Sequence, residues 1–137
     1  ALQRPVITVF DGGLDQEYHS FTHLLFAKGC LPSAELAVCT RFYAFARAVL
    51  PPPDLVVYLP VDIPTLLARR ATRQRHTVDQ SFDAREFELI QGLLEAWLDS
   101  HTASPVLRLA GQHALHEHPQ ALQTLASQVM DSINTYF

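Results

Sequence analysis

The stretch PPPDLVVYLPVDIPTLLARRATRQR, residues 51–75, decides the fold of this chain. Its prolines end one element, and residues 55–59 then form a short apolar run rich in β-branched and aromatic side chains. This composition predicts a strand buried on both faces, as the strands of parallel sheets are. Asp62 supplies an N-cap and Pro64 a proline in the first turn, so a helix is predicted to follow the strand directly.

The predicted helix ends in a cluster of arginines: Arg69, Arg70, Arg73 and Arg75. Guanidinium groups bind phosphate oxygens in pairs, and a phosphoryl-transfer enzyme needs positive charge that closes over a polyphosphate. The alternative is that these cations complement the dipole at the end of the helix and form a solvated face. The spacing alone leaves both interpretations open.

Composition limits the class of protein. The chain has 137 residues, of which 48% are hydrophobic and 18% charged, so we expect one globular domain with a real core. A net charge of −4 excludes a general nucleic-acid binder, and no apolar run is long enough to span a membrane. Cys30 and Cys39 have neither zinc-motif nor CxxC spacing, which favours reduced, mostly buried thiols in a cytoplasmic protein.

The other predicted elements alternate in type. Strands are expected at residues 5–10 and 105–109, and helices at 15–28, 33–50, 83–98 and from 119 onward. This order predicts an α/β fold in which helices flank a parallel β-sheet. The helix at 33–50 carries aromatic residues on more than one face, so we expect burial on two sides, in the core or against a partner subunit.

With these pieces in this order, the chain resembles the C-terminal two-thirds of a deoxynucleoside kinase of the P-loop kinase superfamily, related more distantly to thymidylate kinases. The resemblance covers nearly the whole chain. It is carried by RPVITVFDGGLDQEY (4–18), LPPPDLVVYLPVDIPTLLARRATRQR (50–75), DAREFELIQGLLEAWL (83–98) and PVLRL (105–109). It implies a single P-loop kinase-like domain over residues 1–137, truncated at its N-terminus and lacking the strand that carries the P-loop.

The resemblance also assigns roles to residues. Asp11 matches an acidic residue near the phosphates and magnesium, so Asp11 is expected to be catalytic together with Arg73 and Arg75. Glu17 falls near the position that reads the nucleobase edge, and Phe21 near an aromatic that packs on the base. The remaining expected site residues are Asp79, for the sugar hydroxyl, and the phosphate-binding lid arginines Arg69, Arg70, Arg73 and Arg75.

Each of these assignments has a simpler alternative. Asp11 with Gly12 is a common turn pair, and the alternation around Glu17 and Phe21 also suits a helix that is half core and half surface. The histidines of HALHEH (113–118) do not match HExxH, so we expect a solvent-exposed loop and no metal ligands.

Two departures from the family pattern bear on activity. Gly12 and Gly13 stand where the family has arginine and serine, and the chain has no GxxxxGK(S/T), its single lysine being Lys28. We therefore expect a kinase that, in its full-length form, transfers phosphoryl from ATP to a deoxynucleoside 5′-hydroxyl with Mg²⁺, while these residues alone are inactive. Two alternatives stay open: a degenerate, non-catalytic binding or dimerisation subunit, and a thymidylate kinase-like nucleotide kinase. The expected partners are a deoxynucleoside, a nucleoside triphosphate, and a second copy or a paralogous kinase, with no nucleic acid or membrane.

Overall fold

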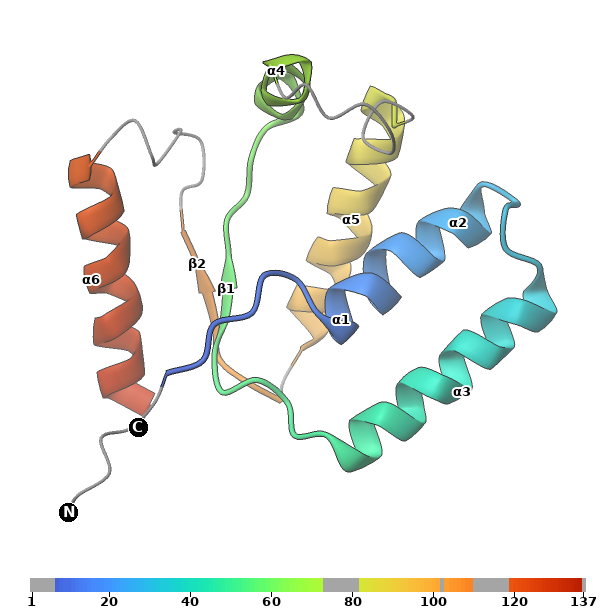
Figure 1. The fold of residues 1–137 in the computed structure, drawn as a ribbon, viewed down its shortest axis with the longest axis horizontal. Coiled ribbons are helices and arrows are strands. Elements are labelled where there is room, and N and C mark those ends of the chain that lie inside the picture. The colour runs from blue at the N-terminus through green and yellow to red at the C-terminus, as the bar shows by residue number, and fades with distance from the viewer. Residues whose placement is uncertain (1–6, 73–81, 102, 110–118, 137) are drawn as a thin grey trace. The chain divides into compact units, whose positions relative to one another are not determined.

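The computed structural model describes residues 7–72, 82–101, 103–109 and 119–136 (Figure 1). It is mostly helical with a two-stranded parallel sheet, so the predicted α/β class with helices flanking a parallel sheet is confirmed. The chain divides into two compact units, Ala1–Val49 and Leu50–Phe137.

From residue 7 onward, where the structure describes it, the first unit contains two long helical stretches. Helices α1 (Leu14–Gln16), η1 (Glu17–Thr22) and α2 (His23–Ala27) follow one another without a break, and α3 (Ser33–Val49) contacts η1. Both predicted helices are confirmed, and Gly29 ends the first with φ 71°, a value that glycine adopts without strain. The sequence pattern did not predict that η1 is a π-helix. Leu24 and Ala46 form the buried apolar centre of this unit.

The strand predicted at residues 5–10 is wrong within the part that the structure describes. Residues 7–10 lie outside any strand, with Val9 86% and Phe10 80% exposed. A strand requires a neighbour that pairs with its N–H and C=O groups, and β-propensity alone does not supply one. Over the described ranges no strand pairs with this segment.

The second unit is built on the sheet. Strands β1 (Val56–Tyr58) and β2 (Val106–Arg108) are parallel, and Tyr58 lies opposite Arg108. Both strands match their predicted positions, but burial on both faces of β1 is wrong. Tyr58 is buried whereas Val57, whose side chain points to the opposite face, is 39% exposed. The core of this unit contains Tyr58, Leu98 and Leu109.

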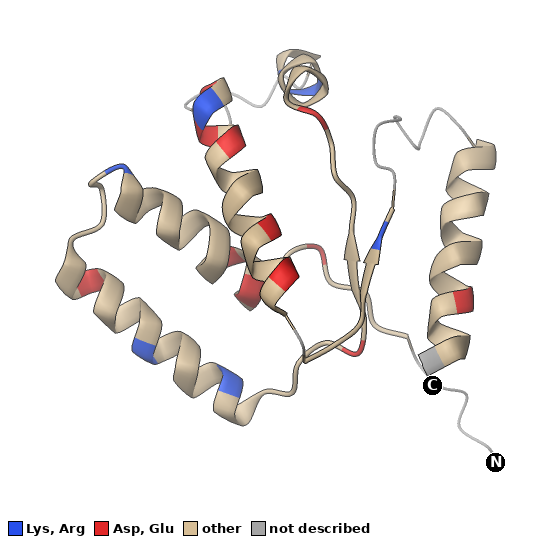
Figure 2. Cartoon of the chain, turned by 180° about the vertical axis from the view of Figure 1, so that it is seen from behind, with Lys and Arg blue, Asp and Glu red and all other residues tan. Residues whose placement is uncertain are grey.

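Among the described residues, the second unit also contains three helices: α4 (Ile63–Thr72), α5 (Ala84–Ser100) and α6 (Pro119–Tyr136). The predicted Asp62 cap is present, and Asp83 caps α5 as well. The Thr65 amide donates to Asp62 Oδ1 at 2.7 Å, and Asp83 forms a capping box with Glu86. The strands lie between α5 and α6 in both Figure 1 and Figure 2. The apolar side chains that recur at helical spacing on α5 are each buried or half-buried: Phe87, Ile90, Leu94, Trp97 and Leu98.

Two general expectations can be checked on the described ranges. Cys39 is half-buried but Cys30 is exposed, so burial of both thiols is wrong, although neither forms a disulfide. Cys30 sits on the turn that follows α2, where short connecting segments run over the surface. Of the helices described, none has the length and apolar character needed to cross a membrane.

Candidate functional site

The expected phosphate-site residue Asp11 is exposed and precedes a backbone of unusual geometry. Gly12 has φ 80° and Gly13 φ 120°, both in the region that L-residues with a Cβ rarely adopt. These are the two positions at which the resemblance places an arginine and a serine in the family pattern. The local backbone is therefore one that suits glycine, and an arginine at position 12 in this conformation would be strained.

The two residues expected to contact a nucleobase both lie on η1. Glu17 is exposed and Phe21 is half-buried, and positions four apart lie about one helical turn apart on the same side. The Thr22 hydroxyl donates to the Glu17 carbonyl at 3.0 Å, across the five-residue step of a π-helix. Single π-helical turns are rare and occur frequently at functional sites.

The first unit also holds a polar cluster that the sequence did not reveal. Tyr43 Oη of α3 donates to Asp15 Oδ1 at 2.8 Å, and His19 Nε2 lies 3.0 Å from the same hydroxyl oxygen. The Tyr18 ring stacks on Tyr43 with centroids 4.1 Å apart and planes 8° apart. We call Asp15, Tyr18, His19 and Tyr43 the Tyr43 cluster. It joins α1 and η1 to α3.

Two members of the Tyr43 cluster, Asp15 and Tyr18, make further polar contacts with α3. Arg47 Nε lies 3.6 Å from Asp15 Oδ1, and the Tyr18 hydroxyl donates to Thr40 Oγ1 at 3.0 Å. Burial raises the pKa of Tyr43 to about 12, and the hydrogen bond to Asp15 contributes to the same shift. Sequence reasoning did not identify Tyr43 as a site residue, and the one signal available was the four-residue spacing of Asp15 and His19, which places both on the same side of a helix.

In the second unit, the base of the expected lid is tied to α5. The Arg70 guanidinium donates to the Phe82 carbonyl and lies 6.0 Å from the centre of the Phe87 ring. This arginine thus joins the end of α4 to the start of α5. Arg69 is half-buried on the same helix, and the Asp62 pKa is lowered chiefly by the Thr65 amide, with a smaller contribution from Arg69. The other expected lid residues, Arg73, Arg75 and Asp79, lie outside the described residues.

A second set of contacts ties the sheet to α5. Tyr58 Oη donates to Glu95 Oε1 at 3.1 Å, and burial followed by this hydrogen bond raises the pKa of Tyr58 to about 12. Arg108, opposite Tyr58 on β2, lies over the Tyr58 ring and pairs with Asp99 at 2.5 Å. The sequence did not single out any of these residues. Their contacts are accounted for by packing of the sheet.

The raised pKa values predict a loss of stability in alkali. In the folded chain the pKa of Tyr43 and that of Tyr58 are raised to about 12, whereas the ordinary pKa of tyrosine is 10.0. Their contribution to the free energy of unfolding is therefore complete below pH 10 and is lost as the pH rises towards 12. Urea unfolding at about pH 9 and about pH 11 measures this loss. We expect a smaller loss for Tyr43→Phe than for wild type, and an equal loss would contradict the assignment.

The described residues contain no group of three or more histidine, cysteine, aspartate or glutamate side chains placed to hold a metal ion. The histidine-rich segment at 113–118 lies outside these residues, so the expectation that it binds no metal stays a prediction.

The sequence model of the family described as "Deoxynucleoside kinase" matches residues 3–134. No curated protein sequence matches the chain at a significant level. The matched range includes the glycine pair, η1, the Tyr43 cluster and the arginines of α4.

Proposed function

Because the chain belongs to the deoxynucleoside kinase family, we propose that it forms the nucleoside-binding and lid part of a deoxynucleoside kinase-like phosphotransferase. In its full-length form this enzyme transfers the γ-phosphoryl group of ATP to the 5′-hydroxyl of a deoxynucleoside. The observation that carries the proposal is the family match over residues 3–134. The match extends over both units, so it includes the expected base-reading segment and the expected lid.

The proposed nucleoside contacts lie on η1. The Glu17 carboxylate is an acceptor with two oxygens, which suits the N–H donors on the edge of a nucleobase, and it is exposed. Phe21 supplies a ring that can pack on the base. We assign the phosphate end to Asp11, Arg73 and Arg75 and the sugar hydroxyl to Asp79, on the resemblance alone.

ATP and Mg²⁺ are the cofactors that the family implies, and the residues that the structure describes do not form a site for them. The 137 residues contain no GxxxxGK(S/T), and Lys28 is followed by Gly29 and Cys30 rather than preceded by a glycine-rich loop. Asp11 is a single exposed carboxylate, and the described ranges hold no metal-binding group of three. We therefore derive no step through either cofactor and propose that the 137 residues alone do not phosphorylate a substrate.

One observation favours the alternative of a degenerate, non-catalytic subunit. Gly12 and Gly13 stand in place of the family's arginine and serine, in backbone conformations that suit glycine. An arginine that stabilises the charge of a phosphoryl-transfer transition state contributes roughly 10³–10⁵ to the rate. A thymidylate kinase-like enzyme has no such observation in its favour, since the matching family is that of the deoxynucleoside kinases.

Calorimetry with a panel of deoxynucleosides and their 5′-monophosphates tests these functions on the chain itself. Binding of at least one deoxynucleoside, more tightly than its monophosphate, supports the proposal. Tighter binding of the monophosphate supports the alternative of a thymidylate kinase-like nucleotide kinase. The absence of heat from every member of the panel contradicts the proposal and leaves the subunit interpretation.

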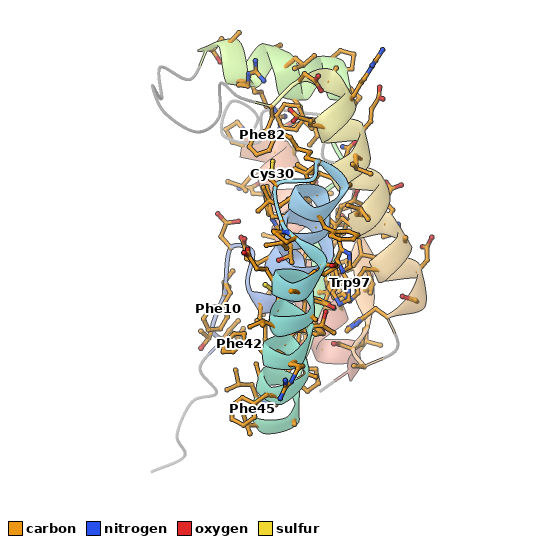
Figure 3. The ribbon with its side chains drawn as sticks, turned by 90° about the vertical axis from the view of Figure 1, so that its right-hand side faces the viewer. Phe10, Cys30, Phe42, Phe45, Phe82 and Trp97 are labelled. Atoms are coloured by element: carbon orange, nitrogen blue, oxygen red, sulfur yellow. The ribbon has the colours of Figure 1, made fainter. Side chains whose placement is uncertain are left out.

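The exposed side of α3 is evidence that the protein associates with a partner subunit. We propose that this partner is a second copy or a paralogous kinase. Val38, Phe42, Phe45 and Val49 recur at helical spacing and are each 61–65% exposed. Tyr43 lies on the opposite side, against η1, so one of the two sides expected to be buried has its contacts, and burial of the other side against a partner stays a prediction. Figure 3 shows Phe42 and Phe45 on one side of the first unit, and Figure 2 shows few charged residues along α3. We call these four residues the α3 stripe.

The free thiols of Cys30 and Cys39 fit a reducing compartment, and we place the protein in the cytoplasm.

A charge introduced into the α3 stripe is expected to prevent this association. Phe45→Lys puts an ammonium group at the centre of an apolar contact, where burying an unpaired charge costs several kcal/mol. Light scattering after size exclusion should give a dimer mass for wild type and a monomer mass for the variant. Ala44→Lys, exposed on the flank of the same helix, should remain dimeric. A monomeric wild type, or loss of the dimer in both variants, contradicts the proposal.

A further inference from the structure

The hydroxyl of Tyr43 joins two helical segments of different type. Asp15 belongs to α1, the last α-helical turn before the π-helix, and His19 is the third residue of η1. Both lie within hydrogen-bond distance of the same oxygen, at 2.8 and 3.0 Å. Tyr43 therefore bridges the junction at which α-helical geometry changes to π-helical geometry.

The protons of this bridge can be assigned from the contacts. A phenol has one proton, and Tyr43 donates it to the Asp15 carboxylate. His19 Nε2 must then carry a proton and donate it to the Tyr43 oxygen. Both bonds thus have one fixed direction, from His19 to Tyr43 to Asp15. The Tyr43 ring is held in turn by stacking on Tyr18.

The expected base-binding residues lie on another side of the same helix. Glu17 and Phe21 follow Asp15 and His19 by two positions, which is roughly half a turn. The bridge therefore does not occupy the face that would meet a nucleoside. Its effect on that face is through the position of the helix.

π-Helical turns are rare in comparison with α-helical ones, so we expect η1 to need contacts from outside the helix, such as those of Tyr43, to keep this geometry. If η1 relaxed to α-helical geometry, the hydrogen bonds would shift from a five-residue to a four-residue step. Phe21 would then rotate relative to Asp15 by up to about 100°, the angle that one residue spans. Ser20, whose hydroxyl donates to the Gln16 carbonyl at 2.5 Å, and Thr22 hold the backbone from within the helix. Tyr43 holds it from α3.

We propose that Tyr43, bonded to Asp15 and His19, is a positioning residue that keeps η1 in its π-helical geometry and so sets the orientation of Glu17 and Phe21 towards a nucleoside. This inference rests on the proposed function. Tyr43 does not contact the nucleoside itself. Its contribution to binding passes through Glu17 and Phe21.

A double-mutant cycle between Tyr43 and Glu17 tests this route. Calorimetry on the chain would compare wild type, Tyr43→Phe, Glu17→Gln and the double variant with the deoxynucleoside that binds best. We expect Tyr43→Phe to weaken binding about tenfold, and we expect the loss in the double variant to be clearly smaller than the product of the two single losses, the remainder passing through Phe21. Losses that multiply in the double variant would overturn the inference. Tyr18→Phe, which removes the hydrogen bond to Thr40 between the same helices, is the matched control and should change affinity less than about twofold.

Amide hydrogen exchange gives a readout that needs no nucleoside. In Tyr43→Phe the amides of residues 17–22 should exchange about tenfold faster or more, and in Tyr18→Phe they should remain close to wild type. Unchanged exchange in Tyr43→Phe would overturn the inference. Faster exchange together with no nucleoside binding by wild type would support the hold on η1 and contradict the proposed function, so the two failures can be told apart.

Discussion

Glu17→Gln is expected to weaken deoxynucleoside binding by about 10- to 100-fold. The carboxylate accepts hydrogen bonds with both oxygens, whereas the amide offers one acceptor and places an N–H opposite a nucleobase donor. A hydrogen bond to a charged group contributes roughly 1.5–3 kcal/mol, and each 1.4 kcal/mol is a factor of ten in affinity. Glu17 is exposed, so the free energy of unfolding should change by less than about 0.5 kcal/mol.

The matched control for this prediction is Glu35→Gln. Glu35 is also exposed and lies in the first turn of a helix, α3. Each variant replaces one glutamate by glutamine, so Glu35→Gln and Glu17→Gln have the same net charge. Calorimetry should show wild-type affinity for Glu35→Gln. Equal affinity of the two variants, whether both weakened or both unchanged, would show that Glu17 does not read the base.

Leu24→Ala should have the largest effect on stability in the first unit. Leu24 is fully buried, with 0% of its side chain exposed, and it is the largest side chain in the described residues to be so. Truncating a buried leucine costs about 2.7–5 kcal/mol, because the lost transfer energy adds to the cost of the cavity. Domains have only about 5–15 kcal/mol of stability in all. Urea unfolding should therefore show a large fall in the midpoint, or a unit that is unfolded without urea.

The adjacent residue supplies the control. Leu25 is 43% exposed, and the same truncation there removes fewer contacts and leaves no closed cavity. We expect Leu25→Ala to cost less than half as much as Leu24→Ala. Similar losses for both would mean that the packing of α2 differs from the structure.

The elements that the sequence predicted correctly are those with a local signal. Asp62 and Asp83 mark helix starts through their own side chains, and both caps are formed. The two strands of the sheet follow from short apolar runs, and their parallel direction follows from the helices between them. Gly29 ends α2 because it can adopt a positive φ.

The features that were wrong or missed depend on partners distant in sequence. Residues 7–10 have the composition of a strand, but pairing is not a local property. The π-helix at 17–22 is joined to Tyr43, more than 20 positions away, and no pattern in residues 17–22 announces that contact. The sequence pattern favours a role for Arg70 in binding phosphate in the lid, whereas its contacts with Phe82 and Phe87 could be identified only from the structure. The match to the family shows the class of protein, and it leaves each site residue to be tested by substitution.

The most direct test of the central claim is a phosphoryl-transfer assay on protein expressed from the complete reading frame, beside the 137-residue chain. Both would receive γ-labelled ATP, Mg²⁺ and the deoxynucleoside that binds best, after their intact masses are measured. We predict that a product larger than 15.4 kDa will yield labelled 5′-monophosphate, while the 137 residues alone yield none. A complete product of 15.4 kDa, or a larger one that transfers no phosphate, would contradict the kinase assignment and leave the non-catalytic subunit.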